Sequence, residues 1–173
     1  MFTSKSAPDS EFSKWFKELV LGQLSHGQHA RLLRFIRDTN ASMAFEVIDP
    51  VRDPHIIAYE SAHVVLLDVI HRAQQFQRVP YAQLCKIGRF FNLPVKKRTM
   101  TFHKWENLAG WLQQAQQPGW TLKGQHVEGF VLEDDAGFIT KVKLDYYNHW
   151  KRMRGLAQRI LRIRNSNKPL GRD

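Results

Sequence analysis

The chain has 173 residues, and its 26 lysine and arginine residues against 16 aspartate and glutamate residues give a formal net charge of +10. Apolar residues make up 43% of the sequence, so the chain can bury the core of one domain and is not a disordered basic tail. It contains no run of 18 apolar residues and no apolar segment typical of a signal peptide, which predicts a soluble, cytoplasmic protein.

The first half of the chain is predicted to hold two helices followed by strands. Apolar residues at helical spacing predict helices over residues 10–21 and 26–38. Short runs rich in β-forming residues, separated by Asp-Pro turns, predict strands at residues 44–48, 55–59 and 64–70.

The second half is predicted to hold three helices and a hairpin. Two helices are expected over residues 80–91 and 105–117, and strands at 126–132 and 138–144 flank an Asp/Gly turn. The last helix, residues 145–164, has one apolar face that is expected to dock and one basic face. Residues 165–173 are expected to form a flexible basic tail. The pattern as a whole predicts one α+β unit, an antiparallel sheet flanked by helices.

The positive charge is concentrated in two segments. Residues 1–140 hold 16 basic and 14 acidic residues, whereas residues 141–173 hold 10 basic and 2 acidic residues. A second stretch, residues 86–104, has six lysine and arginine residues and no acid. Such segments indicate a polyanionic partner. If charge is the only evidence considered, a solvated basic surface without a partner explains it equally well.

Cysteine and histidine point to no catalytic or metal site. The single cysteine, Cys85, excludes an internal disulfide and a cysteine-based zinc site, and its apolar neighbours predict a buried helical residue. His26 and His29 share a helix face, but no third ligand accompanies them.

Four charged residues lie inside predicted strands, where a charge is costly unless it faces water or a ligand: Glu46, Glu128, Lys141 and Lys143. Because strand side chains alternate, Lys141 and Lys143 should share one face. Lysines that neutralise phosphate, together with carboxylates that hold a divalent metal or a ribose hydroxyl, suit a nucleotide. An exposed hairpin with a cross-strand Glu and Lys pair explains each motif taken singly.

Four segments follow one another in the order Phe45-Glu46, Leu66-Leu67-Asp68-Val69, Glu128-Gly129-Phe130-Val131 and Lys141-Val142-Lys143. This order resembles the later nucleotidyltransferase motifs of the ATP-dependent RNA ligases, most closely the bacteriophage RNA ligase 1 type. The likeness extends to residues 44–50 and 55–59, to residues 143–151, and to residues 3–6, which are similar to a short strand after the family's nucleophile. Residues 72–120 match only in being helical.

The resemblance implies a partial nucleotidyltransferase domain of the ATP-grasp-like ligase fold and a three-step reaction. A lysine attacks ATP and retains AMP, the AMP moves to a 5′-phosphate of RNA, and a 3′-hydroxyl displaces it to seal the strand. The implied cofactors are ATP and Mg²⁺, and the implied partner is RNA with 5′-phosphate and 3′-hydroxyl ends.

The resemblance also assigns roles to individual residues. It implies that Lys141 and Lys143 neutralise the α-phosphate and that Glu128 binds Mg²⁺. Glu46 is implied to contact the ribose or to help the metal site. Lys5 is implied to contact phosphate, and Tyr147 to supply a hydroxyl to the nucleotide site. The basic face of the last helix, with Lys151, Arg152, Arg154 and Arg159, is expected to bind the RNA backbone.

One motif of the family is missing from the sequence. The family's nucleophile lies in a Lys-x-Asp-Gly motif, and no lysine of this chain is followed by x-Asp-Gly. The resemblance therefore implies that residues 1–164 are a truncated ligase domain, inactive alone. The implied origins are a truncated gene, a misplaced start codon, or a split enzyme in which an upstream-encoded polypeptide supplies the nucleophile. The alternative is a non-catalytic RNA-binding or structural remnant.

Overall fold

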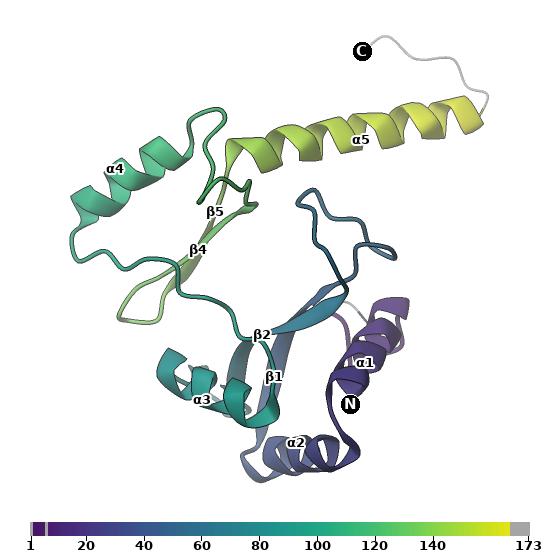
Figure 1. Cartoon of the computed structure of the whole chain (residues 1–173), viewed down its shortest axis with the longest axis vertical. Coiled ribbons are helices and arrows are strands. Elements are labelled where there is room, and N and C mark those ends of the chain that lie inside the picture. Colours follow the sequence, from purple (N-terminus) through teal and green to yellow (C-terminus); the bar gives the residue numbers. More distant parts are fainter. Residues whose placement is uncertain (1, 6, 167–173) are drawn as a thin grey trace. The chain divides into compact units, whose positions relative to one another are not determined.

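The computed structural model describes residues 2–5 and 7–166, which fall into two compact units. Unit 1 consists of Met1–Pro54 and Tyr59–Thr99, and unit 2 consists of His55–Ala58 and Met100–Asp173. The predicted α+β class with antiparallel sheets is confirmed (Figure 1). The single predicted sheet is instead two sheets within the described residues, one in each unit.

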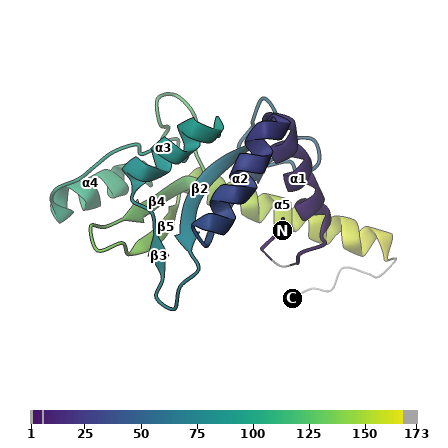
Figure 2. The same ribbon diagram turned by 90° about the horizontal axis from the view of Figure 1, so that it is seen from below.

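Unit 1 is built on a three-stranded antiparallel sheet in the order β1-β2-β3. Its elements are α1 (Glu11–Gln23), α2 (His26–Asp38), β1 (Ala41–Ile48), β2 (His63–His71), β3 (Gln77–Arg78) and α3 (Tyr81–Phe91). Figure 2 shows the long β2 strand beside the helices of this unit. The helices and the sheet share one apolar core, whose largest fully buried side chains include Phe91, Leu66 and Leu84.

Two of the helix boundaries follow from capping side chains. Ser10 accepts a hydrogen bond from the Ser13 backbone N–H and begins α1. Ser25 begins α2 with a capping box, in which its hydroxyl accepts from the Gln28 N–H while the Gln28 side chain accepts from the Ser25 N–H. These caps explain why the predicted starts of both helices are confirmed to within a residue.

The predicted strand at residues 55–59 is wrong. The first strand of the sheet pairs directly with His63–His71, and Ile48 lies opposite His63. The intervening residues form a loop that contains Pro50 and Pro54, which have no N–H to donate to a ladder. The apolar run of residues 55–59 therefore belongs to a connection rather than to the sheet.

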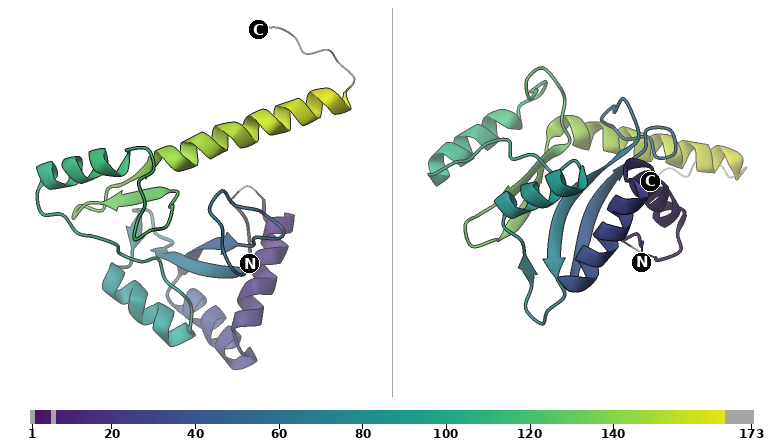
Figure 3. Two further views of the ribbon diagram at one scale, coloured as in Figure 1. Left: turned by 45° about the horizontal axis from the view of Figure 1, so that its top comes forward. Right: turned by 60° about the horizontal axis from the view of Figure 1, so that its bottom comes forward.

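Unit 2 is built on the hairpin of β4 (Gly129–Glu133) and β5 (Ile139–Lys143), with α4 (Trp105–Ala115) before it and α5 (Asp145–Asn165) after it. Trp111 of α4 lies 4.7 Å from Phe130 of β4, between ring centroids, and Trp120 also contacts both rings. These aromatic side chains pack α4 onto one face of the hairpin. Figure 3 shows the ribbon of α4 beside the two strands.

Helix α5 does not dock its apolar face as the sequence predicts. None of its residues is buried, and Trp150, Ile160 and Leu161 are 48%, 49% and 54% exposed. Of the predicted tail, Asn165 ends α5 and Ser166 caps it, while residues 167–173 lie outside the described residues. Within the described part of the chain, no helix is both long and apolar enough to cross a membrane.

Candidate functional site

The β4–β5 hairpin presents one covered face and one exposed face. Phe130 and Val142 are a register pair on the face toward α4, and both side chains are half-buried. Val131 and Lys141 are the next pair, on the opposite face, and both are exposed. Lys143 shares this exposed face, so the prediction that the two lysines lie on one face is confirmed.

Glu128 is held at the end of the hairpin by the backbone directly after β5. Its carbonyl accepts a hydrogen bond from the N–H of Leu144 at 3.1 Å. The next residue must be glycine, because a Cβ at Gly129 would lie 2.1 Å from the carbonyl oxygen of Val142. The Glu-Gly dipeptide therefore lets β4 pass close to β5 and places the carboxylate beside Lys143.

Glu128, Lys143, Tyr147 and Lys151 form a cluster around this hairpin end, which we call the Glu128 cluster. Lys143 donates a hydrogen bond to the Glu128 carboxylate. The Lys143 Nζ also lies 4.6 Å from the centroid of the Tyr147 ring, and the Lys151 Nζ lies 5.7 Å from the same centroid. Two ammonium groups thus flank the Tyr147 ring, and one of them also pairs with the Glu128 carboxylate. With two lysines and one glutamate, the cluster holds one positive charge in excess.

The two other predicted nucleotide contacts belong to unit 1. Glu46 is exposed on β1, opposite Val65. Lys5 is exposed before α1, and the described residues around it form no strand, contrary to the resemblance. The reason is that Ser4 forms its hydrogen bonds with nearby residues rather than with a neighbouring strand. Its N–H donates to Ser13 Oγ at 2.9 Å, and its hydroxyl donates to the Ala7 carbonyl.

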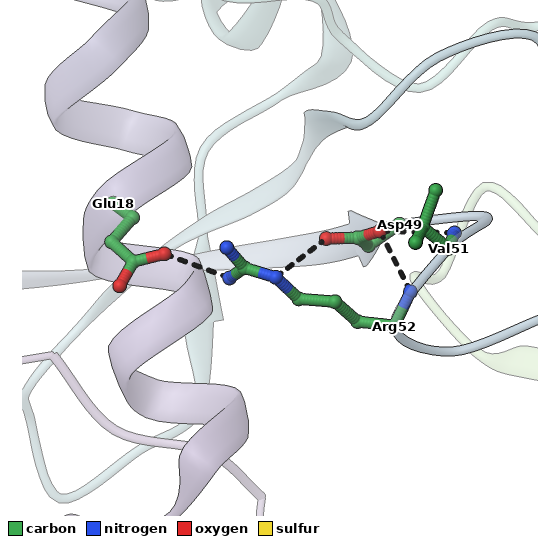
Figure 4. A network of polar contacts seen from close by, with 4 residues as sticks. All are labelled: Glu18, Asp49, Val51 and Arg52. Atoms are coloured by element: carbon green, nitrogen blue, oxygen red, sulfur yellow. Dashed lines mark hydrogen bonds and ion pairs between the residues drawn. The ribbon is translucent and has the colours of Figure 1, made fainter.

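The chain just after Glu46 is fixed by a network of polar contacts, where the sequence predicts only a turn (Figure 4). The buried Asp49 carboxylate accepts from the N–H groups of Val51 and Arg52 at 3.1 and 3.0 Å. The Arg52 guanidinium then donates to Glu18 of α1 at 2.7 Å, and this hydrogen bond raises the pKa of Arg52 above its ordinary value. The turn after β1 is thereby tied to α1.

The comparison with protein families decides the class of the chain. A family model described as RNA ligase matches residues 1–147, which is most of the sequence. This chain belongs to the RNA ligase family. The comparison with curated proteins gives no match. The matched range contains both exposed lysines of β5, Glu128 and Tyr147, and it ends within the first turn of α5.

Two arrangements of polar side chains in the structure were not foreseen from the sequence. Asp68 of β2 lies between Arg78 and Lys96, whose cationic groups are 3.3 and 3.2 Å from its Oδ2. His126 stacks on Tyr146 with ring centroids 3.8 Å apart and planes inclined by 6°. The position of Asp68 inside an apolar strand was the available indication for the first, and no sequence pattern indicates the second.

The structure also revises the prediction for the cysteine. Cys85 is half-buried rather than buried, and it lines an open groove beside α3. The neighbouring positions Leu84 and Ile87 are the ones that α3 buries. The described residues contain no group of three or more histidine, cysteine, aspartate or glutamate side chains that could hold a metal by themselves.

Proposed function

We propose that this member of the RNA ligase family provides the phosphate-binding and metal-binding part of an ATP-dependent RNA ligase, which joins 5′-phosphate and 3′-hydroxyl ends through AMP intermediates. The observation that carries the proposal is the Glu128 cluster beside the exposed Lys141, within the range that matches the family. An ordinary hairpin accounts for one Glu and Lys pair, but membership of the family favours the interpretation as a site.

The proposed roles follow from charge and exposure. Lys141 has no ion pair among the described residues, and its exposed ammonium group is available to neutralise phosphate oxygens. Lys143 would also bind the phosphate when a phosphate oxygen replaces the Glu128 carboxylate as the acceptor of its hydrogen bond. In-line transfer between phosphate oxygens needs little from a protein except positioning and charge neutralisation, which these side chains supply. Tyr147 would contribute its hydroxyl to the nucleotide site.

Glu128 fits a magnesium ion that is shared with a substrate phosphate. Mg²⁺ takes oxygen ligands, keeps several waters, and is commonly held by one or two carboxylates plus phosphate. The half-exposed Glu128 carboxylate lies next to phosphate-binding lysines, which is the donor set that such a site needs. When bound, the ion would withdraw negative charge from the reacting phosphate. We propose that Glu46 and Lys5 of unit 1 contribute further nucleotide contacts, at the ribose or metal and at a phosphate.

The chain is proposed to be inactive alone in the first step of the reaction. None of its lysines lies in a Lys-x-Asp-Gly motif, so the covalent nucleophile would have to lie outside these 173 residues. A polypeptide encoded immediately upstream is the proposed source.

Incubation with α-labelled ATP and Mg²⁺, with and without that upstream polypeptide, tests this assignment of the nucleophile. We expect covalent label only in the mixture. Label on the chain alone would contradict the proposal that it lacks the nucleophile. Label in neither sample would favour the non-catalytic RNA-binding alternative.

That second candidate is favoured by one observation, the exposure of α5. Its basic residues include Lys151, Arg152, Arg154 and Arg159, all exposed, on a helix that buries none of its residues. Such a helix can hold an RNA backbone without any chemistry. The two candidates are compatible in one molecule, because Lys151 also flanks Tyr147 in the Glu128 cluster.

A further inference from the structure

Helix α5 leaves its apolar side chains uncovered by the described part of the chain. Every residue in the range 149–162 is exposed. The large apolar side chains in this range are 45–54% exposed, and they are Trp150, Met153, Leu156, Ile160 and Leu161. The interpretation of α5 as an RNA-binding helix uses its cations and gives these apolar side chains no role.

The apolar side chains share one side of α5. Residues 150, 153, 157 and 160 recur at intervals of three or four, which places them in one row along a helix, and Leu156 and Leu161 lie on either side of that row. We call this surface the α5 apolar face, and its members are Trp150, Met153, Leu156, Ala157, Ile160 and Leu161. The rings that contact Trp150 are those of Tyr146 and His149, which belong to α5 itself.

The opposite side of α5 carries positive charge and no negative charge. Its cations are Lys151, Arg152, Arg154, Arg159 and Arg162, and α5 contains no acidic residue after Asp145. None of these cations forms an ion pair with a described residue. Arg152 and Arg162 donate to backbone carbonyls of their own helix. The charge on this side is therefore not compensated within the described residues.

The combination of the two sides favours a partner that is both apolar and anionic. RNA phosphates would neutralise the cations and leave the aliphatic side chains in water. A second α5 would bring the same set of cations close to the first, and one helix covers only a narrow row of a face this wide. A lipid bilayer with anionic headgroups offers an apolar layer and a negative surface together, so it complements both sides of α5.

We propose that α5 binds the surface of an anionic lipid bilayer and lies in the plane of the membrane. The α5 apolar face enters the boundary between headgroups and acyl chains, and the cations contact headgroup phosphates. Arg152 and Arg154 lie at the two margins of the α5 apolar face, so their guanidinium groups reach headgroups on both sides of the helix. This inference goes beyond the proposed function and does not depend on ligase activity.

Co-sedimentation of the full chain with lipid vesicles tests the inference. One set of vesicles contains phosphatidylcholine alone, and the other contains equal amounts of phosphatidylcholine and phosphatidylglycerol. We expect binding to the anionic vesicles to be at least about tenfold tighter, because each cation near a negative membrane surface adds to the attraction.

Two substitutions on the α5 apolar face separate binding to a bilayer from binding to RNA. Leu156→Gln together with Ile160→Gln removes apolar contacts and leaves every charge in place, so vesicle binding should weaken by about tenfold or more while RNA binding stays unchanged. The matched control is Val51→Gln together with Phe76→Gln, which alters side chains of unit 1 that are 87% and 71% exposed. The control should bind vesicles like the unchanged chain.

Removal of charge should weaken both kinds of binding. A triple variant in which Arg152, Arg154 and Arg159 are replaced by Gln should bind anionic vesicles roughly 10²-fold more weakly than the unchanged chain. It should also bind RNA more weakly, because the same cations serve both partners.

Three results would overturn the inference. The first is absence of binding of the unchanged chain to anionic vesicles. The second is equal vesicle binding by the unchanged chain and by the variant with Leu156→Gln and Ile160→Gln, which would show adsorption by charge alone. The third is sedimentation equilibrium that shows a dimer in the unchanged chain and a monomer in that variant, which would make a second copy the occupant of the α5 apolar face. Failure of the chain to join RNA would contradict the proposed function and leave this inference standing.

Discussion

At the residue scale, the fixed geometry of the Glu128 cluster depends on one glycine. Gly129→Ala would place a methyl group 2.1 Å from the Val142 carbonyl oxygen, so β4 and β5 must separate. We expect the free energy of unfolding to fall by about 1–3 kcal/mol, as for other overpacked sites. Gly110→Ala on α4 is the matched control, since no atom lies within 4 Å of its new Cβ. Urea unfolding of both variants measures the difference, and equal stability would refute the close approach.

Glu128 itself should matter little for folding. Its ion pair with Lys143 is about two fifths exposed on both sides, and such pairs contribute roughly 0–1 kcal/mol. Glu128→Gln should therefore unfold at nearly the urea concentration of the unchanged chain, as should Glu106→Gln, which alters an exposed carboxylate of the same unit. A large drop in stability for Glu128→Gln alone would make the residue structural and would count against a metal-binding role.

The face shared by Lys141 and Lys143 could be predicted from the sequence, because it follows from the two-residue period of a strand. The neighbours of Tyr147 could not, since the cation contacts depend on how α5 begins directly after β5. The open groove beside α3 was equally hidden, because it arises from the chain reversal at Asn92. Cys85 was expected to be buried because its neighbours Leu84 and Ile87 are apolar, and it lines that groove instead.

At the element scale, α5 gives the clearest prediction for RNA. Removing one phosphate-binding side chain should reduce the slope of log Kd against log salt by about 0.7 for single-stranded RNA. A triple variant in which Arg152, Arg154 and Arg159 are replaced by Gln should thus reduce that slope by roughly 2. The control is a triple variant on α2, in which Arg31, Arg34 and Arg37 are replaced by Gln. It removes the same amount of charge and should reduce the slope much less. Equal reductions would mean that only net charge attracts RNA.

Helix boundaries were the most predictable elements, and β-pairing the least. Ser25 and Gln28 cap α2 from within four residues of sequence, so local information suffices. The false strand at residues 55–59 has the right composition, but a strand also needs a partner at a distance, and β2 already pairs with β1 and β3. The exposed apolar face of α5 shows that amphipathic pattern alone does not establish docking.

At the scale of the whole molecule, the residues proposed to contact the nucleotide come from both units. Lys5 and Glu46 belong to unit 1, and the Glu128 cluster with Lys141 belongs to unit 2. The sequence order of the motifs indicated the family, which the match over residues 1–147 confirms. The division into two units could not be predicted, because hydrophobic periodicity shows where elements lie and not which of them share a core.

The central claim is that Glu128 and Lys141 belong to the site that joins RNA ends. The third step of the proposed reaction tests this claim most directly, because that step needs no covalent lysine. The 3′-hydroxyl oxygen of one RNA attacks the 5′-phosphorus of a pre-adenylylated RNA. The phosphodiester forms, the bond from phosphorus to the AMP oxygen breaks, AMP leaves, and the hydroxyl proton passes to solvent. The measurement is the yield of joined RNA with Mg²⁺ and without ATP.

We expect the chain to join pre-adenylylated RNA, and to join none when it is given ATP and RNA with an ordinary 5′-phosphate. Glu128→Gln and Lys141→Ala should each lower the sealing rate by about 10²-fold or more, as removal of a charge-stabilising group does elsewhere. Glu106→Gln should seal at the rate of the unchanged chain. Sealing that persists in Glu128→Gln and Lys141→Ala, or no sealing by the unchanged chain while it binds RNA, would contradict the account.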